Sequence, residues 1–196
     1  MEIIMHRRNT LAELESTPAA YGVEMDIRTW NGELIVQHEP FTEGPLFAAW
    51  LAQYHHGTLI LNVKEEGLEE KVLELLRKQS ISNFFFLDQS FPFLLKTARA
   101  GVRRCAVRVS EYESMETALR LAPLIDWVWV DCFTRFPLNT EQAEALQAAG
   151  LKLCLVSPEL EGFGRGAVQD MRVQIEDLGI RAEAVCTKFP ELWQCV

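Results

Sequence analysis

Short apolar segments alternate with segments of helical spacing along the whole chain. The apolar segments are rich in β-branched and aromatic residues and show little alternation with polar positions, which is typical of strands buried on both faces. They predict strands at residues 2–5, 22–27, 58–63, 83–87, 105–109, 127–130, 151–156 and 182–186.

The segments between these strands repeat apolar residues every three or four positions, which predicts amphipathic helices. Clear stripes are Leu68, Val72, Leu75 and Leu76, then Met115, Ala118, Leu119 and Ala122, and finally Val168, Met171, Ile175 and Leu178. Start and stop residues predict further helices from Pro45 to Gly57, from Pro92 to Gly101, and from Asn139 or Thr140 to Gly150. The first helix is confined to residues 9–16, and only residues 190–196 follow the last strand.

An insertion follows the second strand. Trp30-Asn31-Gly32-Glu33 predicts a tight turn, and residues 34–37 predict a short extra strand. The remaining pattern is eight strands, seven of them followed by helices. It favours an α/β fold in which residues 1–196 form one small single-domain (β/α)8 TIM barrel with shortened first and last helices.

Composition narrows the classes of partner. The chain of 196 residues is 48% hydrophobic, enough for one sizeable core, and its net charge is -9. A negative chain is not expected to bind nucleic acid or anionic membranes through a broad basic surface. The N-terminus lacks a signal-peptide pattern and no apolar run is long enough to span a bilayer, so no integral membrane association is expected. The sequence leaves the oligomeric state open.

Five cysteines are spaced without any CxxC pair. They are Cys105, Cys132, Cys154, Cys186 and Cys195, and the first four lie in apolar, strand-like runs. This spacing favours buried free thiols in a reducing compartment over a zinc site or disulfides. A cytoplasmic location is therefore expected.

Two carboxylates lie on one face of the second predicted strand. Alternate side chains of a strand share a face, so Glu24 and Asp26 project together, whereas Val23, Met25 and Ile27 face the other way. Like charges at this spacing repel, and a divalent cation is the simplest group that relieves the repulsion. The pair therefore predicts a metal site.

Polar side chains follow most of the other predicted strands, at the end of a barrel where active sites lie. The set is His6, Arg7, Asn62, Lys64, Asp88, Arg108, Asp131 and Lys188, with His38 after the insertion. Phosphodiester cleavage needs a cation, cationic side chains for the phosphate oxygens, and an acid–base pair. We assign His6 and His38 to proton transfer and Arg7 and Lys64 to the phosphate. Asp88, Arg108, Asp131 and Lys188 are candidate substrate contacts or members of an ion-pair network.

The order His6-Arg7, Glu24-x-Asp26 and His38 resembles the signature of the glycerophosphodiester phosphodiesterase family, within the phospholipase C-like phosphodiesterases. The signature covers residues 1–38, and Lys64 matches the lysine of the family's third-strand motif. The resemblance implies a (β/α)8 barrel that binds one Mg2+ or Ca2+ ion on the Glu-x-Asp pair and uses two catalytic histidines. The third metal carboxylate of the family falls on Asn62, whose amide oxygen coordinates without adding charge.

Three functions are compatible with these residues. The first is a divalent-metal-dependent phosphodiesterase, or phospholipase C-like lyase, that cleaves a small glycerol- or sugar-phosphodiester. The second is a catalytically weak or inactive barrel that binds a phosphorylated ligand through Arg7, Lys64 and Arg108. The third is a metal-assisted aldolase or isomerase, which no lysine context in the chain favours.

Overall fold

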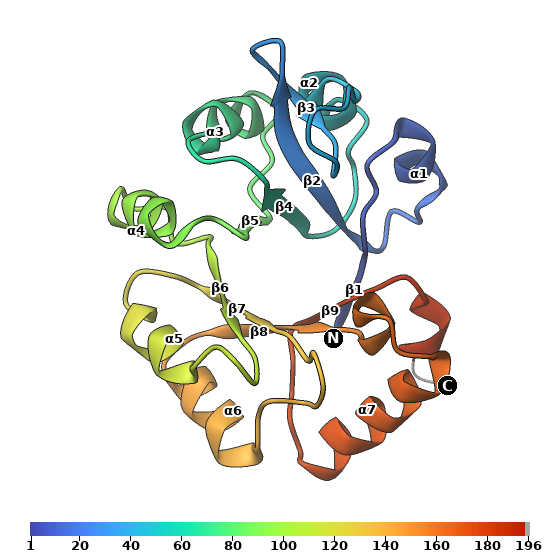
Figure 1. The fold of residues 1–196 in the computed structure, drawn as a ribbon, viewed down its shortest axis with the longest axis vertical. Helices are drawn as coiled ribbons and strands as arrows, with labels where there is room; N and C mark the ends of the chain where they lie inside the picture. The colour runs from blue at the N-terminus through green and yellow to red at the C-terminus, as the bar shows by residue number, and fades with distance from the viewer. Residues whose placement is uncertain (195–196) are drawn as a thin grey trace.

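The computed structural model describes residues 1–194, which form a nearly closed barrel of parallel strands surrounded by helices (Figure 1). In this part of the chain the barrel strands are β1 (Glu2–Met5), β2 (Gly22–Trp30), β4 (Leu59–Val63), β5 (Phe84–Leu87), β6 (Ala106–Val109), β7 (Trp127–Val130), β8 (Lys152–Val156) and β9 (Ala184–Thr187). Their order in the sheet is β5-β4-β2-β1-β9-β8-β7-β6. The expected (β/α)8 barrel is confirmed.

The helices found within residues 1–194 are α1 (Leu11–Ser16), α2 (Phe47–Leu51), α3 (Glu69–Lys78), α4 (Phe91–Arg99), α5 (Met115–Leu121), α6 (Thr140–Ala148) and α7 (Arg165–Asp177), with short 3-10 turns η1 (Pro158–Glu161) and η2 (Pro190–Leu192). The first and last helical elements are short, as the sequence predicts. None of the helices in the described chain has the length and apolarity needed to cross a membrane.

Two apolar clusters hold the fold together. Inside the barrel, inward-facing residues such as Ile4, Phe85 and Trp127 form one cluster. The larger cluster lies between the strands and the helices and includes Val23 and Met25. Buried Cys105, Cys132, Cys154 and Cys186 are free, as expected, whereas Cys195 lies outside the described residues. With the apolar side chains of β2 turned outward, Glu24 and Asp26 are left for the barrel interior.

Capping residues explain several of the helix limits. Thr10 begins α1 through a capping box with Glu13, and Asn139 begins α6 through another with Gln142. Gly101 and Gly150 follow α4 and α6 with φ of 91° and 84°, the left-handed conformation of a helix stop.

The helix predicted from Pro45 to Gly57 is wrong in length, because α2 ends at Leu51. Groups that would continue the helix bond elsewhere: Gly57 N–H, which would donate to the Gln53 carbonyl in a longer helix, donates to the Tyr21 carbonyl at 2.8 Å. Tyr54 Oη donates to the Gly57 carbonyl at 2.5 Å, and His55 Nδ1 lies 2.8 Å from the Gln53 carbonyl. Such local bonds compete with the helical ladder.

The insertion after β2 is a β-hairpin, as predicted. Strand β3 (Glu33–Val36) pairs antiparallel with β2. Asn31 and Gly32 connect them with φ of 51° and 84°. Positive φ at both central residues is the geometry of a type I′ turn, which Asn-Gly favours.

The barrel wall is weakest between β5 and β6. In the described chain these strands are joined by a bridge between Phe86 and Cys105, with Phe86 N–H donating to the Arg104 carbonyl at 3.0 Å. By contrast, β4 pairs with β5, and β6 pairs with β7, over four residues each. This seam lies close to the polar ends of the two strands.

Gly22 occupies a position too crowded for a side chain. A β-carbon there would lie 2.7 Å from the Thr58 carbonyl oxygen and 2.8 Å from Ile4 Cγ1. We expect Gly22→Ala to lower the free energy of unfolding by about 1–3 kcal/mol, because the strands must move apart. The matched Gly166→Ala change in α7 meets no atom within 4 Å and is expected to be neutral or stabilising. Urea denaturation of both variants measures the difference, and equal losses would contradict this packing.

Candidate active site

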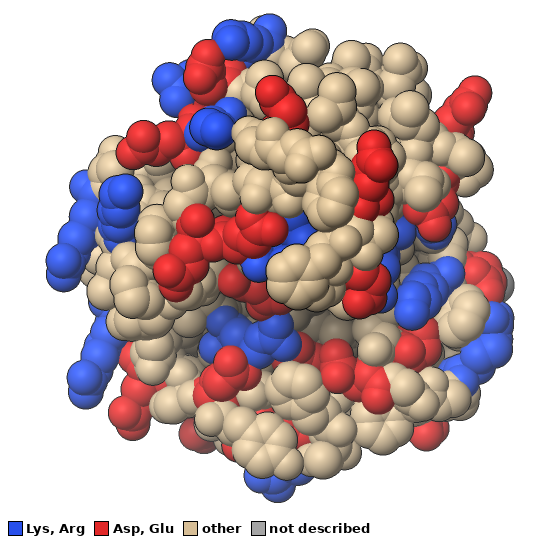
Figure 2. All heavy atoms as spheres, turned by 45° about the horizontal axis from the view of Figure 1, so that its top comes forward, with Lys and Arg blue, Asp and Glu red and all other residues tan. Residues whose placement is uncertain are grey.

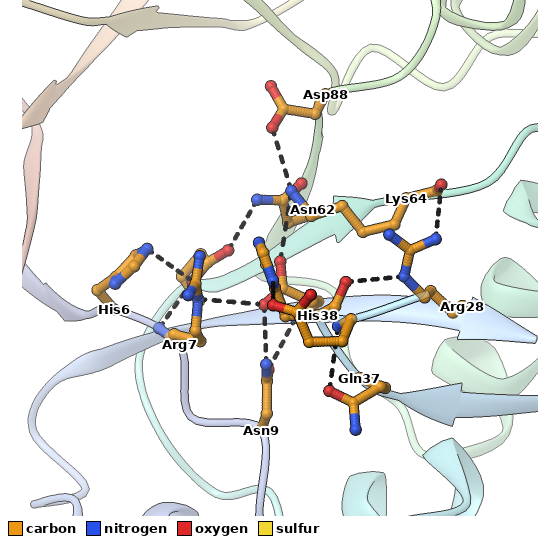
Figure 3. Close-up of polar contacts among 12 residues, drawn as sticks. His6, Arg7, Asn9, Arg28, Gln37, His38, Asn62, Lys64 and Asp88 are labelled. Carbon is orange, nitrogen blue, oxygen red and sulfur yellow. Dashed lines mark hydrogen bonds and ion pairs between the residues drawn. The ribbon is translucent and has the colours of Figure 1, made fainter. Parts of the chain in front are cut away.

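The polar site begins where β1 ends. Arg7 has φ of 55°, a strained conformation for a residue with a side chain. This turn directs the Arg7 backbone N–H at Glu24 Oε2, 2.7 Å away, and places His6 Nε2 3.8 Å from the same oxygen. The strained turn at Arg7 thus places His6 and Arg7 next to Glu24 of β2. Figure 3 shows His6 and Arg7 side by side at this point.

Asp26 is held by a residue that lies seventeen positions earlier in the chain. Asn9 Nδ2 donates to Asp26 Oδ2 at 2.8 Å, and the Asp26 backbone N–H donates to Asn9 Oδ1 at 2.9 Å. Lys64 Nζ lies 3.4 Å from Asp26 Oδ1, and Arg7 Nε lies 3.5 Å from Oδ2. The Asp26 carboxylate is thus fixed in position and partly neutralised.

Glu24 and Asp26 are each only 1% exposed. Burial, together with the negative charge of Asp26, raises the pKa of Glu24 to about 7. Desolvation disfavours the charged form of a carboxyl group and a neighbouring carboxylate disfavours it further. Glu24 therefore tends to take up a proton near neutral pH, and a bound cation would relieve the same repulsion.

The oxygen atoms available at this point fit a hard divalent cation. Asn62 Nδ2 donates to Glu24 Oε1 at 3.0 Å, which turns the Asn62 amide oxygen away from Glu24. Asn62 Oδ1 is buried and accepts no hydrogen bond from residues 1–194, and buried Asp26 Oδ1 has only the ion pair with Lys64 Nζ at 3.4 Å. Carboxylate and amide oxygens are the donors that Mg2+ and Ca2+ use. The described chain contains no group of three or more His, Cys, Asp and Glu side chains able to hold a metal. A cation bound by Glu24 and Asp26 would therefore need the Asn62 amide oxygen as its third protein ligand.

His6 lies in a buried, positively charged environment. Burial, and then the charges of Arg7, Lys188 and Lys64, lower its pKa from 6.5 to about 3. Its imidazole is therefore neutral at physiological pH. Nδ1 has no hydrogen-bond partner in the described part of the structure, so it remains an available proton acceptor.

The opposite wall of the site is an ion-pair network. Arg108 pairs with Asp88 at 2.5 Å and also with Asp131, and Lys64 Nζ lies 3.5 Å from Asp88. Asp88 has φ of 58°, so the site contains a second strained residue at a strand end. Asp88, Arg108 and Asp131 therefore pair with one another while they also face the cavity.

A cavity of about 160 Å³ joins these groups, lined by His6, Arg7, Glu24, Asn62, Lys64, Leu87, Asp88, Arg108, Trp129, Asp131, Val156, Leu160 and Glu161. Most of the predicted site residues thus meet in one place. Figure 2 shows a hollow near the middle of this face, with basic and acidic side chains mixed around it.

Three predicted residues are not part of this lining, namely Asp26, His38 and Lys188. Asp26 still contacts Arg7 and Lys64 of the lining. His38 is one-third exposed, and its Nδ1 lies 2.7 Å from Glu39 Oε1. Arg28 fixes the backbone nearby, because Arg28 Nε donates to the His38 carbonyl at 2.9 Å and Nη1 donates to the Lys64 carbonyl at 3.3 Å (Figure 3). Lys188 is exposed and reaches the site through its charge, which contributes to the low pKa of His6.

Sequence reasoning did not assign several residues of the site. Asn9, which fixes Asp26, was treated only as part of the first helical segment. Trp129 and Leu160 carry no polar signal of a site. Glu161 belongs to the Gly-rich segment 161–166, which predicts a loop or lid, and it lines the cavity at the end of η1. Burial and the nearby Asp131 raise the Glu161 pKa.

Comparison with known proteins places the fold. No family model matches the chain, and no curated protein matches it in sequence. Among solved structures, a glycerophosphodiester phosphodiesterase from Agrobacterium tumefaciens str. C58 superposes with a TM-score of 0.67 at 17% identity over 98% of each chain. A glycerophosphoryl diester phosphodiesterase from Parabacteroides distasonis has a TM-score of 0.63 at 13% identity, over 95% of this chain and 82% of the other.

A tryptophan synthase α-subunit from Pyrococcus furiosus is also similar, with a TM-score of 0.51 at 11% identity over 94% of this chain and 85% of the other. These TM-scores establish a shared barrel fold. At such low sequence identity, the reaction has to be argued from the residues of the site. The resemblance found in the sequence is confirmed at the level of the fold.

The buried state of His6 gives a pH dependence with a defined sign. Its pKa is about 3 in the folded protein and near 6.5 when unfolded, so between these values the unfolded chain binds the additional proton. The contribution of His6 to stability is therefore lost as the pH falls below about 6.5, amounting to about 2 kcal/mol at pH 5.

The free energy of unfolding of the wild type is expected to fall between pH 7 and pH 5 because His6 resists protonation in the folded state. In His6→Asn we expect this fall to be smaller by about 2 kcal/mol. Urea denaturation at both pH values measures this difference, and NMR titration of the His6 ring checks its cause. His55→Asn, at an exposed position, is the control. A His6 ring that titrates near pH 6.5 would contradict the burial described above.

Proposed function

We propose that the protein is a divalent-metal-dependent phosphodiesterase that cleaves a small glycerol- or sugar-phosphodiester. The observation that carries this proposal is the meeting of His6, Arg7, Glu24, Asn62 and Lys64 in one cavity at the strand ends of the barrel. These residue types supply the cation site, the phosphate contacts and the proton acceptor that the reaction requires. The shared fold of proteins named as glycerophosphodiester phosphodiesterases adds support.

In this proposal Glu24, Asp26 and Asn62 would hold one Mg2+ or Ca2+ ion, which when bound would supply positive charge to neutralise and polarise the phosphate. Arg7 and Lys64 bind the phosphate oxygens. Both are within 3.5 Å of Asp26 carboxylate oxygens, so a bound phosphate replaces or shares partners that they already have. Their charge is therefore held at the site before the substrate arrives, which lowers the reorganisation required.

Proton transfer is assigned to the two histidines. His6 is neutral and has an unpaired Nδ1, so it accepts a proton from the attacking hydroxyl group or water. His38 protonates the departing alcohol. Glu39 occupies its Nδ1, which leaves Nε2 for that transfer. Arg28 holds the His38 backbone at a fixed distance from Lys64 and supports this role.

A second candidate function rests on Asn62. With an amide in place of a third carboxylate, and with Lys64 and Arg7 on Asp26, the site already neutralises part of its charge. A protein that binds a phosphate ester without metal and leaves it intact would use the same residues. Metal dependence of binding separates the two functions.

Activity on a panel of phosphodiesters, such as glycerophosphodiesters and bis(p-nitrophenyl) phosphate, tests the first candidate. We expect turnover with Mg2+ or Ca2+, loss of turnover in EDTA, and a decrease in kcat of about 10²–10⁴-fold for His6→Ala and for His38→Ala. His55→Ala, at an exposed histidine that follows α2, is the control. Equal rates in EDTA and in His6→Ala would exclude the mechanism.

Asn62→Asp tests the cation site without relying on turnover. The change removes the hydrogen bond to Glu24 and adds a third buried carboxylate, so we expect a loss of about 2 kcal/mol in stability without metal. We also expect tighter Ca2+ or Mg2+ binding by calorimetry, since affinity rises with the number of charged ligands. Asn83→Asp, at the opposite end of the neighbouring strand, is the matched control. No gain in metal affinity at position 62 would show that its side chain does not coordinate.

A further inference from the structure

A second and larger cavity lies at the seam between β5 and β6. Its volume is about 620 Å³, and it is lined by Leu87, Asp88, Gln89, Phe91, Leu94, Ala106, Val107, Arg108, Tyr112, Glu113, Ser114 and Thr117. Figure 1 shows α4 and α5 on either side of this seam. The cavity therefore lies where the barrel wall is joined by the Phe86–Cys105 bridge rather than by a full ladder.

This cavity is lined by residues from both sides of the barrel wall. Leu87 and Ala106 belong to the cluster inside the barrel, whereas Leu94 of α4 belongs to the cluster outside it. Val107 faces outward from β6 and is only partly buried, although outward-facing Val128 of neighbouring β7 is fully buried. Helices α4 and α5 thus leave an apolar part of the strand uncovered.

Two exposed aromatic side chains lie among the lining residues of this cavity. Phe91 is 49% exposed and Tyr112 is 76% exposed, and both line the cavity. Large exposed aromatic side chains gathered at one cavity are unusual on a protein surface and mark binding sites. The charged residues of the lining are Asp88, Arg108 and Glu113, so its net charge is negative and disfavours an anionic group.

The seam cavity and the cavity at His6 adjoin each other and share lining residues. Leu87, Asp88 and Arg108 line both. The cavity at His6 is about 160 Å³, below the roughly 300–1,000 Å³ of pockets that enclose whole ligands. It accommodates a phosphate group, and the rest of a substrate has to extend beyond it. The seam cavity is the adjoining space and has the volume of a ligand pocket.

We infer that the seam cavity binds one of the two alcohol groups of the substrate, and that this group is an uncharged, apolar one, aromatic or aliphatic. This inference rests on the proposed phosphodiesterase function. The phosphate lies at His6, Arg7 and Lys64, and the alcohol passes the Arg108–Asp88 pair to contact Phe91, Leu94, Val107 and Tyr112. Specificity is then set by α4 and α5 rather than by the catalytic residues.

Binding of uncleavable phosphonates tests this subsite independently of turnover. We expect phenylphosphonate to bind the wild type at least about tenfold more tightly than methylphosphonate in the presence of Ca2+, measured by calorimetry, because burial of apolar area adds affinity. Thr117→Phe fills the cavity and is expected to abolish this preference while affinity for methylphosphonate is unchanged. Glu116→Phe, the adjacent exposed position of α5 outside the cavity, is expected to keep it.

Tyr112→Ala is the second variant, because removing a side chain that is 76% exposed leaves the core intact. It is expected to reduce the phenyl preference several-fold. Equal affinities of the wild type for the two phosphonates, or a preference that survives in both Thr117→Phe and Tyr112→Ala, would overturn the subsite. If the preference behaves as expected but no phosphodiester is turned over, the subsite stands and the catalytic proposal fails.

Discussion

The site depends on two carboxylates, Glu24 and Asp26, that project from one strand into the interior of the barrel. Each is 1% exposed, and the repulsion between them adds to the cost of burial. The surrounding groups reduce that cost. Arg7 contributes its backbone N–H and its side chain, Lys64 contributes its ammonium group, and Asn9 and Asn62 contribute amide donors.

The barrel makes these contributions possible because its parallel strands end at a common rim. Asp26 of β2 is paired in register with Asn62 of β4, so the amide of Asn62 reaches Glu24 from the adjacent strand. Lys64 follows two positions later on the same face. The strained turn at Arg7 brings the end of β1 to the same point. Cationic and amide groups from the ends of β1 and β4 thus surround the carboxylate pair. Among residues 1–194, Asn62 Oδ1 accepts no hydrogen bond and Asp26 Oδ1 has only its ion pair with Lys64.

The sequence was sufficient for the strands and for the polar groups at their ends, because both follow from local patterns. Uninterrupted apolar runs such as Trp127–Val130 are specific for buried strands, and Asn31-Gly32 is specific for its turn. The length of α2 was not predictable, because the groups that a longer helix would pair bond elsewhere: Gly57 N–H donates to the distant Tyr21 carbonyl, and the His55 ring lies against the Gln53 carbonyl.

Contacts between distant segments could not be predicted either, because no local sequence pattern encodes them. The bond from Asn9 to Asp26 depends on how the first loop folds back on β2, and no spacing rule encodes it. The seam between β5 and β6 depends on how two strands diverge, and their apolar patterns resemble those of strands that pair fully. His38 is a further example. Its position in the sequence predicts a site residue, but the sequence does not show that its side chain pairs with the adjacent Glu39.

A crystal structure of the protein with Ca2+ and glycerol phosphate tests the central claim most directly. The account predicts a cation at about 2.3–2.6 Å from carboxylate oxygens of Glu24 and Asp26 and from Asn62 Oδ1, as is typical of Ca2+ sites. It also predicts the phosphate against Arg7 and Lys64. A structure in which phosphate binds without a cation, with Lys64 and Arg7 still on Asp26, would contradict it.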